Sequence, residues 1–214
     1  MPAAAGKNLI LEADVKSSFI PIVFQGIISA LFAAAVAKRC SSYINLLGGM
    51  AFSKSEISGV IAIPYFRIVF VTLIYLAVMS CVLALLLWAG NYVVKVRADY
   101  RQMLAAAAVR SAVMVPAILV SLLVFELSSV PGIILFMLVN IWEFFAVFAA
   151  VSSYAGGEKT NALVLLLSIV MLIFIIVVFL VLAEIWTLYL PDTVRTALKT
   201  LGDYSLMDFL NELQ

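Results

Sequence analysis

Long apolar runs separated by short polar stretches dominate the pattern along the chain. Five runs reach the roughly 20 apolar residues that a membrane-spanning helix needs, and they cover about residues 19–37, 68–94, 103–125, 130–151 and 161–183. The pattern therefore predicts an all-α fold, a polytopic membrane protein built as a bundle of five transmembrane helices. Residues 1–18 are predicted to form a short surface segment, residues 19–190 the transmembrane domain, and residues 191–214 an interfacial tail.

The connections between these runs differ in length. The stretch ELSSVPG, residues 126–132, leaves room only for a tight turn, so the third and fourth spans are predicted to form an antiparallel helical hairpin. The longest connection, residues 40–66, joins a flexible YINLLGGMAF to an amphipathic SEISGVIAIPYF that suits either the membrane surface or a segment dipping into the membrane. An odd number of spans places the two termini on opposite sides of the membrane.

Composition supports the same class of protein. The chain is 66% hydrophobic and 12% charged, with a mean hydropathy of +1.21, whereas soluble domains are about half apolar and a quarter charged. A formal net charge of +1 provides no basic surface for nucleic acid, which we do not expect as a partner. The segments outside the spans are too short for a soluble catalytic domain.

The residue types that most catalytic and metal sites require are scarce. The chain has no histidine, and its two cysteines, Cys40 and Cys81, read as free thiols. This removes histidine-based metal sites and histidine-activated nucleophiles. No predicted span contains an aspartate or a lysine for a carboxylate pair or a serine–lysine dyad. We therefore expect neither enzymatic activity nor a cofactor.

Two charged residues fall at membrane depth, where charges are rare and mark functional sites by default. Arg110 lies about two turns into the third span, and Glu143 lies about two turns from the end of the fourth. Because these spans are antiparallel and joined by a tight turn, the two side chains are predicted to meet at similar depth. Asn140 lies one turn from Glu143 and is predicted to join this intramembrane polar cluster.

The sequence leaves three interpretations of Arg110 open. Pairing with Glu143 fixes the register of the hairpin, since either charge left alone in low dielectric costs several kcal/mol. A second interpretation has Arg110 extend, or snorkel, to the basic interface. In the third, the cluster is a coupled ion or proton site, or a site for an anionic headgroup between helices.

Small residues recur four positions apart in three spans. Such stripes let helix backbones approach closely, so they predict packing within the bundle rather than the lining of a pore. Pro116 is predicted to kink or weaken the third span. The stripes are Ser29, Ala33 and Ala37 in the first span, Ala108 and Ala112 in the third, and Ala146 and Ala150 in the fourth.

Charges outside the spans bear on orientation. The numbers of basic residues on the two sides are equal, but the most compact cluster is an interfacial basic loop formed by Lys95, Arg97 and Arg101. Short loops of this kind favour the cytoplasmic side, which predicts a cytoplasmic N-terminus and a C-terminus on the opposite side. The loop serves topology and headgroup contact, or else docks a protein or lipid. Toward the other side of the membrane, Arg67 is a candidate partner for Glu184.

The order of features also carries a family resemblance. A span ending in a basic loop precedes YRQMLAAAAVRSAVMVPAIL, then a short turn, a span with Trp142, a polar GGEKTNAL and a long apolar last span. Over about residues 68–182 this resembles the YIP family, whose eukaryotic founders bind Rab/Ypt GTPases and carry a substantial soluble N-terminal region. With only residues 1–18 before the first span, the chain is more similar to the bacterial and archaeal members. The residues that carry the pattern are Tyr100, Gln102, Ala106 and Pro116, and the short turn contains Pro131 and Gly132.

The resemblance implies five helices, a membrane location and a cytoplasmic N-terminus, but no activity. We expect a non-enzymatic integral membrane protein of YIP-like type in a bacterial or archaeal cytoplasmic membrane. Its expected partners are membrane lipids, together with protein partners or further copies in a homo-oligomer. The alternative is a transporter for a small molecule or ion, or the membrane subunit of one, that uses the cluster of Arg110, Glu143 and Asn140. A deep cavity around Glu143 would favour transport, and dry packing the register role.

Overall fold

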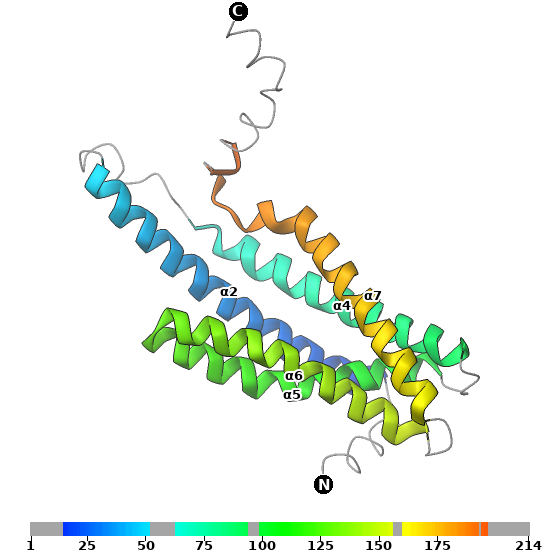
Figure 1. Ribbon diagram of the computed structural model, residues 1–214. Coiled ribbons are helices and arrows are strands. Elements are labelled where there is room, and N and C mark those ends of the chain that lie inside the picture. The colour runs from blue at the N-terminus through cyan, green and yellow to red at the C-terminus, as the bar shows by residue number, and fades with distance from the viewer. Residues whose placement is uncertain (1–14, 52–62, 94–98, 156–159, 193, 197–214) are drawn as a thin grey trace, which may run out of the picture.

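The computed structural model describes residues 15–51, 63–93, 99–155, 160–192 and 194–196. All the regular secondary structure in these ranges is helical: five long helices followed by one short 3₁₀ turn (Figure 1). Each of the five is long and apolar enough to cross a membrane, which confirms the all-α, five-span prediction and supports an integral membrane protein. The helices are α2 (Val15–Ala51), α4 (Tyr65–Val93), α5 (Tyr100–Leu127), α6 (Ser129–Ala155) and α7 (Thr160–Ile185), and the turn is η2 (Trp186–Tyr189).

Helix α2 is longer than the apolar pattern indicates. It has 37 residues, about 55 Å at 1.5 Å per residue, and continues past Lys38 and Arg39 through the first part of the expected connection. The two charges mark the end of the apolar stretch without breaking the helix, because no glycine or proline follows until Gly48. Arg39 is held in place by donating through Nη2 to the Glu126 carbonyl, 3.2 Å away. The amphipathic part of the connection falls mostly in residues 52–62, outside the described residues.

The hairpin of α5 and α6 has the tight turn that the sequence predicts. Ser128 alone separates the two helices, and its N–H donates to the Val124 carbonyl at 2.8 Å. At the other end of α5, the Asp99 N–H donates to Gln102 Oε1 at 2.9 Å, which satisfies part of the helix start. Helix α5 remains one continuous helix through Pro116.

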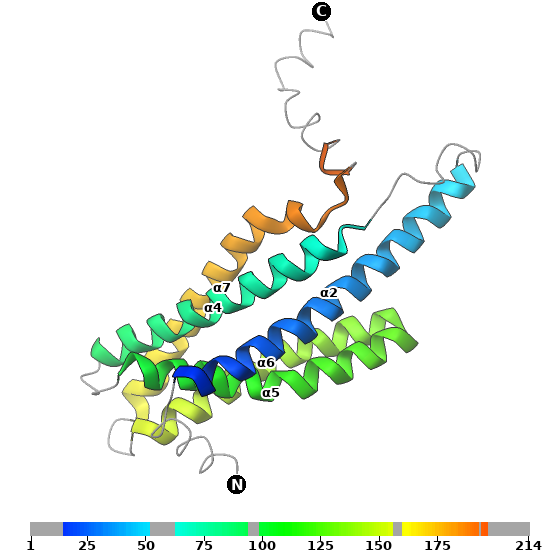
Figure 2. The same ribbon diagram turned by 180° about the vertical axis from the view of Figure 1, so that it is seen from behind.

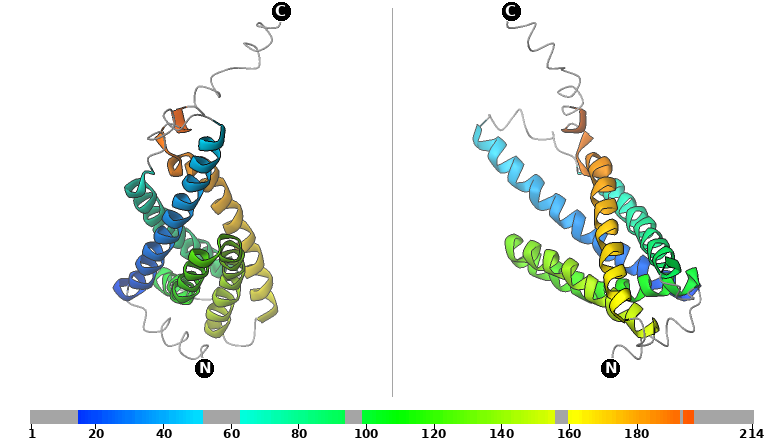
Figure 3. Two further views of the ribbon diagram at one scale, coloured as in Figure 1. Left: turned by 90° about the vertical axis from the view of Figure 1, so that its left-hand side faces the viewer. Right: turned by 45° about the vertical axis from the view of Figure 1, so that its right-hand side comes forward.

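The helices converge at one end of the bundle and spread apart at the other. The convergent end holds the starts of α2, α5 and α7 and the ends of α4 and α6 (Figures 1 and 2). The open end holds the α5–α6 turn, the start of α4 and η2. Toward it, α2 runs between the α5–α6 hairpin on one side and the α4–α7 pair on the other (Figure 3).

Two apolar cores reflect this wedge shape. The larger one fills the convergent end with side chains from all five helices, among them Ile22, Leu83, Val147 and Phe174. Helix α5 contributes a run of alanines, Ala105 to Ala108, each 0% exposed, so the other backbones approach closely there. The smaller core joins only α2, α5 and α6, with residues Phe32, Met114, Ile118, Phe125 and Val139. At that level helices α4 and α7 have diverged from the other three helices.

The hairpin depends on a close backbone contact at Gly132. A Cβ atom added there would lie 2.3 Å from the Phe125 Cα, a clash that is relieved only if one of the two backbones moves.

We expect Gly132→Ala to lower the free energy of unfolding by about 2 to 3 kcal/mol through overpacking, measured by denaturant or thermal unfolding in detergent. Gly26→Ala is the matched control, because its Cβ meets only the flexible end of the Leu73 side chain, at 2.8 Å. Equal stability of the two variants would contradict the contact.

Candidate functional site

The buried face of α5 explains why Arg110 points into the bundle. The first part of the helix, residues 103–108, is buried on all sides, and one face stays buried along its whole length at every third or fourth position. Arg110 occupies one of the positions on this face. It lies ten residues after Tyr100, or about 15 Å along the helix, close to the middle of a hydrocarbon layer about 30 Å thick. The face comprises Met103, Ala107, Arg110, Met114, Ile118, Ser121 and Phe125.

The structure brings Arg110 and Glu143 together at this depth. Arg110 Nη1 lies 3.6 Å from Glu143 Oε1, and the two side chains are only 3% and 13% exposed. The guanidinium also lies 5.7 Å from the centre of the Phe174 ring, within the range of a cation–π contact. Because Arg110 is buried, the interpretation that it snorkels to the interface is wrong.

Asn140 lines the same space as the ion pair, but its amide bonds to the backbone and not to Glu143. Its Nδ2 donates at 2.7 Å to the Phe136 carbonyl one turn earlier in α6, rather than to Glu143. This backbone bond satisfies the donor locally. Of the interfacial basic loop, Lys95 and Arg97 lie outside the described residues, and Arg101 is exposed on the first turn of α5.

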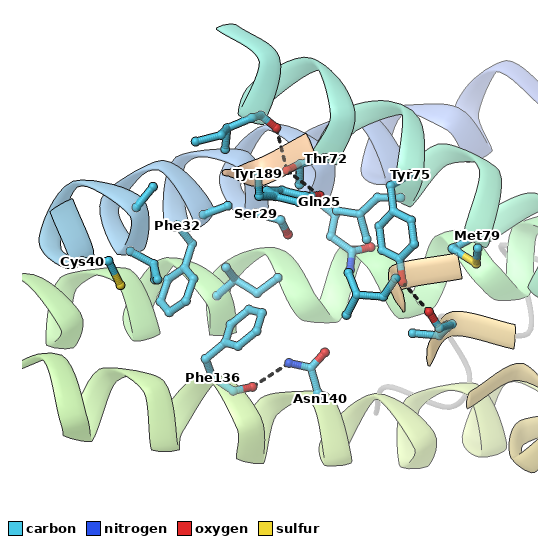
Figure 4. A pocket seen from close by; sticks show the side chains of 18 of the residues that line it. Gln25, Ser29, Phe32, Cys40, Thr72, Tyr75, Met79, Phe136, Asn140 and Tyr189 are labelled. Carbon is cyan, nitrogen blue, oxygen red and sulfur yellow. Dashed lines mark hydrogen bonds between the residues drawn. The ribbon is translucent and has the colours of Figure 1, made fainter. Parts of the chain in front are cut away.

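A cavity of about 600 Å³ lies between the diverging helices (Figure 4). It is lined by residues of all five helices and by the segment after η2, and most of its walls are apolar. Along α2 the lining runs from Gln25 to Ser41, sixteen residues or about 24 Å, which exceeds the roughly 15 Å of one leaflet of the hydrocarbon layer. The cavity therefore extends from mid-depth to the open end.

The inner part of the cavity, its floor, is polar. Gln25 and Ser29 from α2, Tyr75 from α4 and Asn140 from α6 point toward one another across it (Figure 4), and Arg110 and Glu143 complete the lining. Within the described residues, Gln25 Oε1 and Arg110 Nε are buried without a hydrogen-bond partner. Each such group costs about 1 to 3 kcal/mol until something in the cavity satisfies it.

Below the floor the bundle is closed. The large apolar core at the convergent end begins at Met79 and Phe174, which line the inner end of the cavity. Because that core contains buried side chains from all five helices, the described residues close the cavity at this end and form no continuous pore.

The segment after α7 lines one side of the open end of the cavity, which we call its mouth. Arg67 at the start of α4 donates through Nη1 to Asp192 Oδ1 at 2.5 Å and also to the Leu190 carbonyl. Thr72 Oγ1 donates to the Ile68 carbonyl at 2.7 Å and contacts the Tyr189 hydroxyl at 3.3 Å. The expected pairing of Arg67 with Glu184 is therefore wrong. Helix α7 ends just after Glu184 and η2 turns the chain, so Asp192 reaches α4 instead.

Two parts of the site were missed by sequence reasoning. Gln25 was not singled out, although it is a polar residue in an apolar span, ten residues after the start of α2 and thus at the depth of Arg110. The stripe of Ser29, Ala33 and Ala37 was expected to pack against a helix, but it lines the cavity. The prediction for this stripe of the first span fails because the helices separate toward the open end, whereas Ala108 and Ala150 of the other stripes are buried in the bundle.

Comparisons of the chain with family models, curated proteins and solved structures gave no match. The YIP resemblance therefore rests on sequence features alone.

The first test of this site concerns the energy of the buried pair. Arg110→Leu and Glu143→Leu each leave one buried charge, and we expect each to lower the free energy of unfolding by about 3 to 5 kcal/mol. The double variant should recover most of that loss, because neither charge remains. The matched control is Arg67→Leu with Asp192→Leu, whose partly exposed charges should couple by about 1 kcal/mol or less. Additive losses at Arg110 and Glu143 would rule out the structural pairing.

A second test uses the two cysteines to locate the mouth. Cys40 is exposed and lines the outer cavity, whereas Cys81 lies in the middle of α4, half-buried and outside the lining. A water-soluble maleimide should label Cys40 and leave Cys81 unmodified, because the thiolate must meet the reagent in water. Mass spectrometry of the intact protein in membranes, with Cys40→Ser as the control, measures this. Equal labelling of both thiols would show that the cavity does not open where we place it.

Proposed function

We propose that this protein is a non-enzymatic integral membrane protein that binds a lipid-like amphipathic molecule in the cavity between its helices. The observation that carries the proposal is the combination of apolar walls with a buried polar floor. An amphipathic molecule satisfies both at once: its apolar part contacts the walls and its polar part reaches the floor.

The dimensions of the cavity support this proposal. A volume of about 600 Å³ lies within the roughly 300 to 1,000 Å³ typical of small-molecule sites, which are likewise mostly apolar with a few placed polar groups. The depth of about 24 Å along α2 matches an elongated molecule better than a compact ion. Membrane lipids are thus the partners that fit best.

The membrane setting is part of the proposal. We place the protein among YIP-like proteins of a bacterial or archaeal cytoplasmic membrane, with the N-terminus in the cytoplasm. The support is the count of five spans and the compact basic loop that includes Arg101. In this orientation the open end of the bundle faces away from the cytoplasm.

A second function, transport, is favoured by one specific observation. The ion pair of Arg110 and Glu143 lies near mid-depth, reachable from the open end and closed off from the convergent end. Transporters hold their substrate sites near the midplane and expose them to one side at a time. For transport, the core around Leu83 and Val147 has to open during the cycle. Flux of a bound molecule across proteoliposomes distinguishes this function from binding alone.

Filling the cavity tests the proposed binding. Ala33 lines the cavity midway between floor and mouth, and Ala33→Phe should reduce the amount of lipid-like molecule that copurifies from native membranes at least severalfold. Ala112→Phe is the matched control, because Ala112 is exposed on α5 outside the lining. Mass spectrometry of organic extracts gives the bound molecules per protein. An unchanged yield with Ala33→Phe would show that nothing lipid-like occupies the cavity.

A further inference from the structure

Gln25 presents a buried acceptor to the cavity. Its side chain is on α2, it is only 3% exposed, and its Oε1 has no hydrogen-bond partner within the described residues. In Figure 4 it points from α2 toward the space that Tyr75 and Asn140 also face. An amide oxygen in an apolar surrounding requires a donor, so an occupant of the floor has to bring an N–H or O–H group.

Arg110 presents the complementary donor. It is 2% exposed, and its Nε has no partner in the described part of the chain, although Nη1 contacts Glu143. Arg110 and Gln25 line the same cavity from two different helices. A hydroxyl group supplies one donor and two acceptor lone pairs, so one such group offers what each of the two unpartnered atoms lacks.

The charges of the floor disfavour an anionic group there. Arg110 and Glu143 are the charged side chains among the described residues that line the cavity, and their formal charges cancel. A carboxylate or phosphate bound beside Arg110 would also face the Glu143 carboxylate, and like charges repel strongly in a low dielectric. An ionised carboxylate, moreover, has no donor for Gln25 Oε1.

Outward from the floor most of the lining is apolar. Phe32 stacks on Phe136 with ring centres 4.5 Å apart, and the two form one wall together with Met114. We infer that the ligand is an uncharged amphipath whose hydroxyl group lies at the floor and whose apolar body runs toward the open end, and that Gln25 selects this hydroxyl over an apolar end, while Glu143 disfavours an anionic group. This inference rests on the proposed binding function and deepens it by naming the ligand class and a specificity residue.

Three probes with the same apolar chain test the inference on the full-length protein in nanodiscs: hexadecan-1-ol, palmitate and hexadecane. Equilibrium binding of labelled hexadecan-1-ol, with the other two as competitors at neutral pH, gives their relative affinities. We expect the alcohol to bind about tenfold more tightly than either competitor, the factor that corresponds to one buried hydrogen bond.

The substitution Gln25→Leu tests whether Gln25 causes the preference for the alcohol. The substitution keeps the size of the side chain and removes a partnerless polar atom, so it should leave the protein folded and reduce the preference for the alcohol over hexadecane to about twofold or less. Palmitate should still bind more weakly than the alcohol, because the Glu143 carboxylate remains. Asn91→Leu is the matched control. Asn91 is also a buried amide whose Oδ1 lacks a partner among the described residues, but it lies outside the cavity lining. This variant should retain the full preference.

The outcomes separate this inference from the proposed function. Tighter binding of palmitate would make Arg110 an anion receptor and overturn the hydroxyl assignment, while binding in the cavity would stand. A preference for the alcohol over hexadecane that survives Gln25→Leu would overturn the role of Gln25. If none of the three probes binds, and Ala33→Phe leaves the copurified lipid unchanged, then water alone occupies the floor and both proposals fall.

Discussion

The cost of an unpaired charge inside a membrane is the constraint on which the rest of this structure depends. Arg110 occupies a buried position on α5, and hydrocarbon offers no water to solvate it. Glu143 and the Phe174 ring compensate it from two other helices, so the charge ties α5 to both α6 and α7. This requirement favours the observed register of the hairpin and the approach of α7.

The same constraint explains the distribution of packing. At the convergent end the helices are held by small and apolar side chains, Ala105 to Ala108 above all, and no space is left between them. Just above, the ion pair with Gln25 and Asn140 forms a polar layer that cannot pack as tightly as alanine does. The cavity begins at this layer, where the helices diverge (Figure 1) and the polar groups line its inner part.

Much of the fold can be read from the sequence, since a run of about 20 apolar residues has few alternatives to a spanning helix. The contact of Arg110 with Glu143 follows from depth in a tight hairpin, which needs only local information. The cavity could not be predicted in this way, because it depends on the angles between helices far apart in the chain. Ala33 and Ala37 show this, since four-residue spacing places them on one face without saying whether a helix lies opposite. The end of α2 was misplaced because Lys38 and Arg39 limit hydropathy, not helix formation.

The link from Arg67 to Asp192 and the Leu190 carbonyl has a mechanical consequence. It fastens the chain after α7 to the start of α4, so these two helices are joined at the end where the bundle is widest. At the other end of the bundle, α4 and α7 pack in the dense core of the convergent end. A small change in their crossing angle there would produce a larger displacement at the open end, and the link would make the two helices move together.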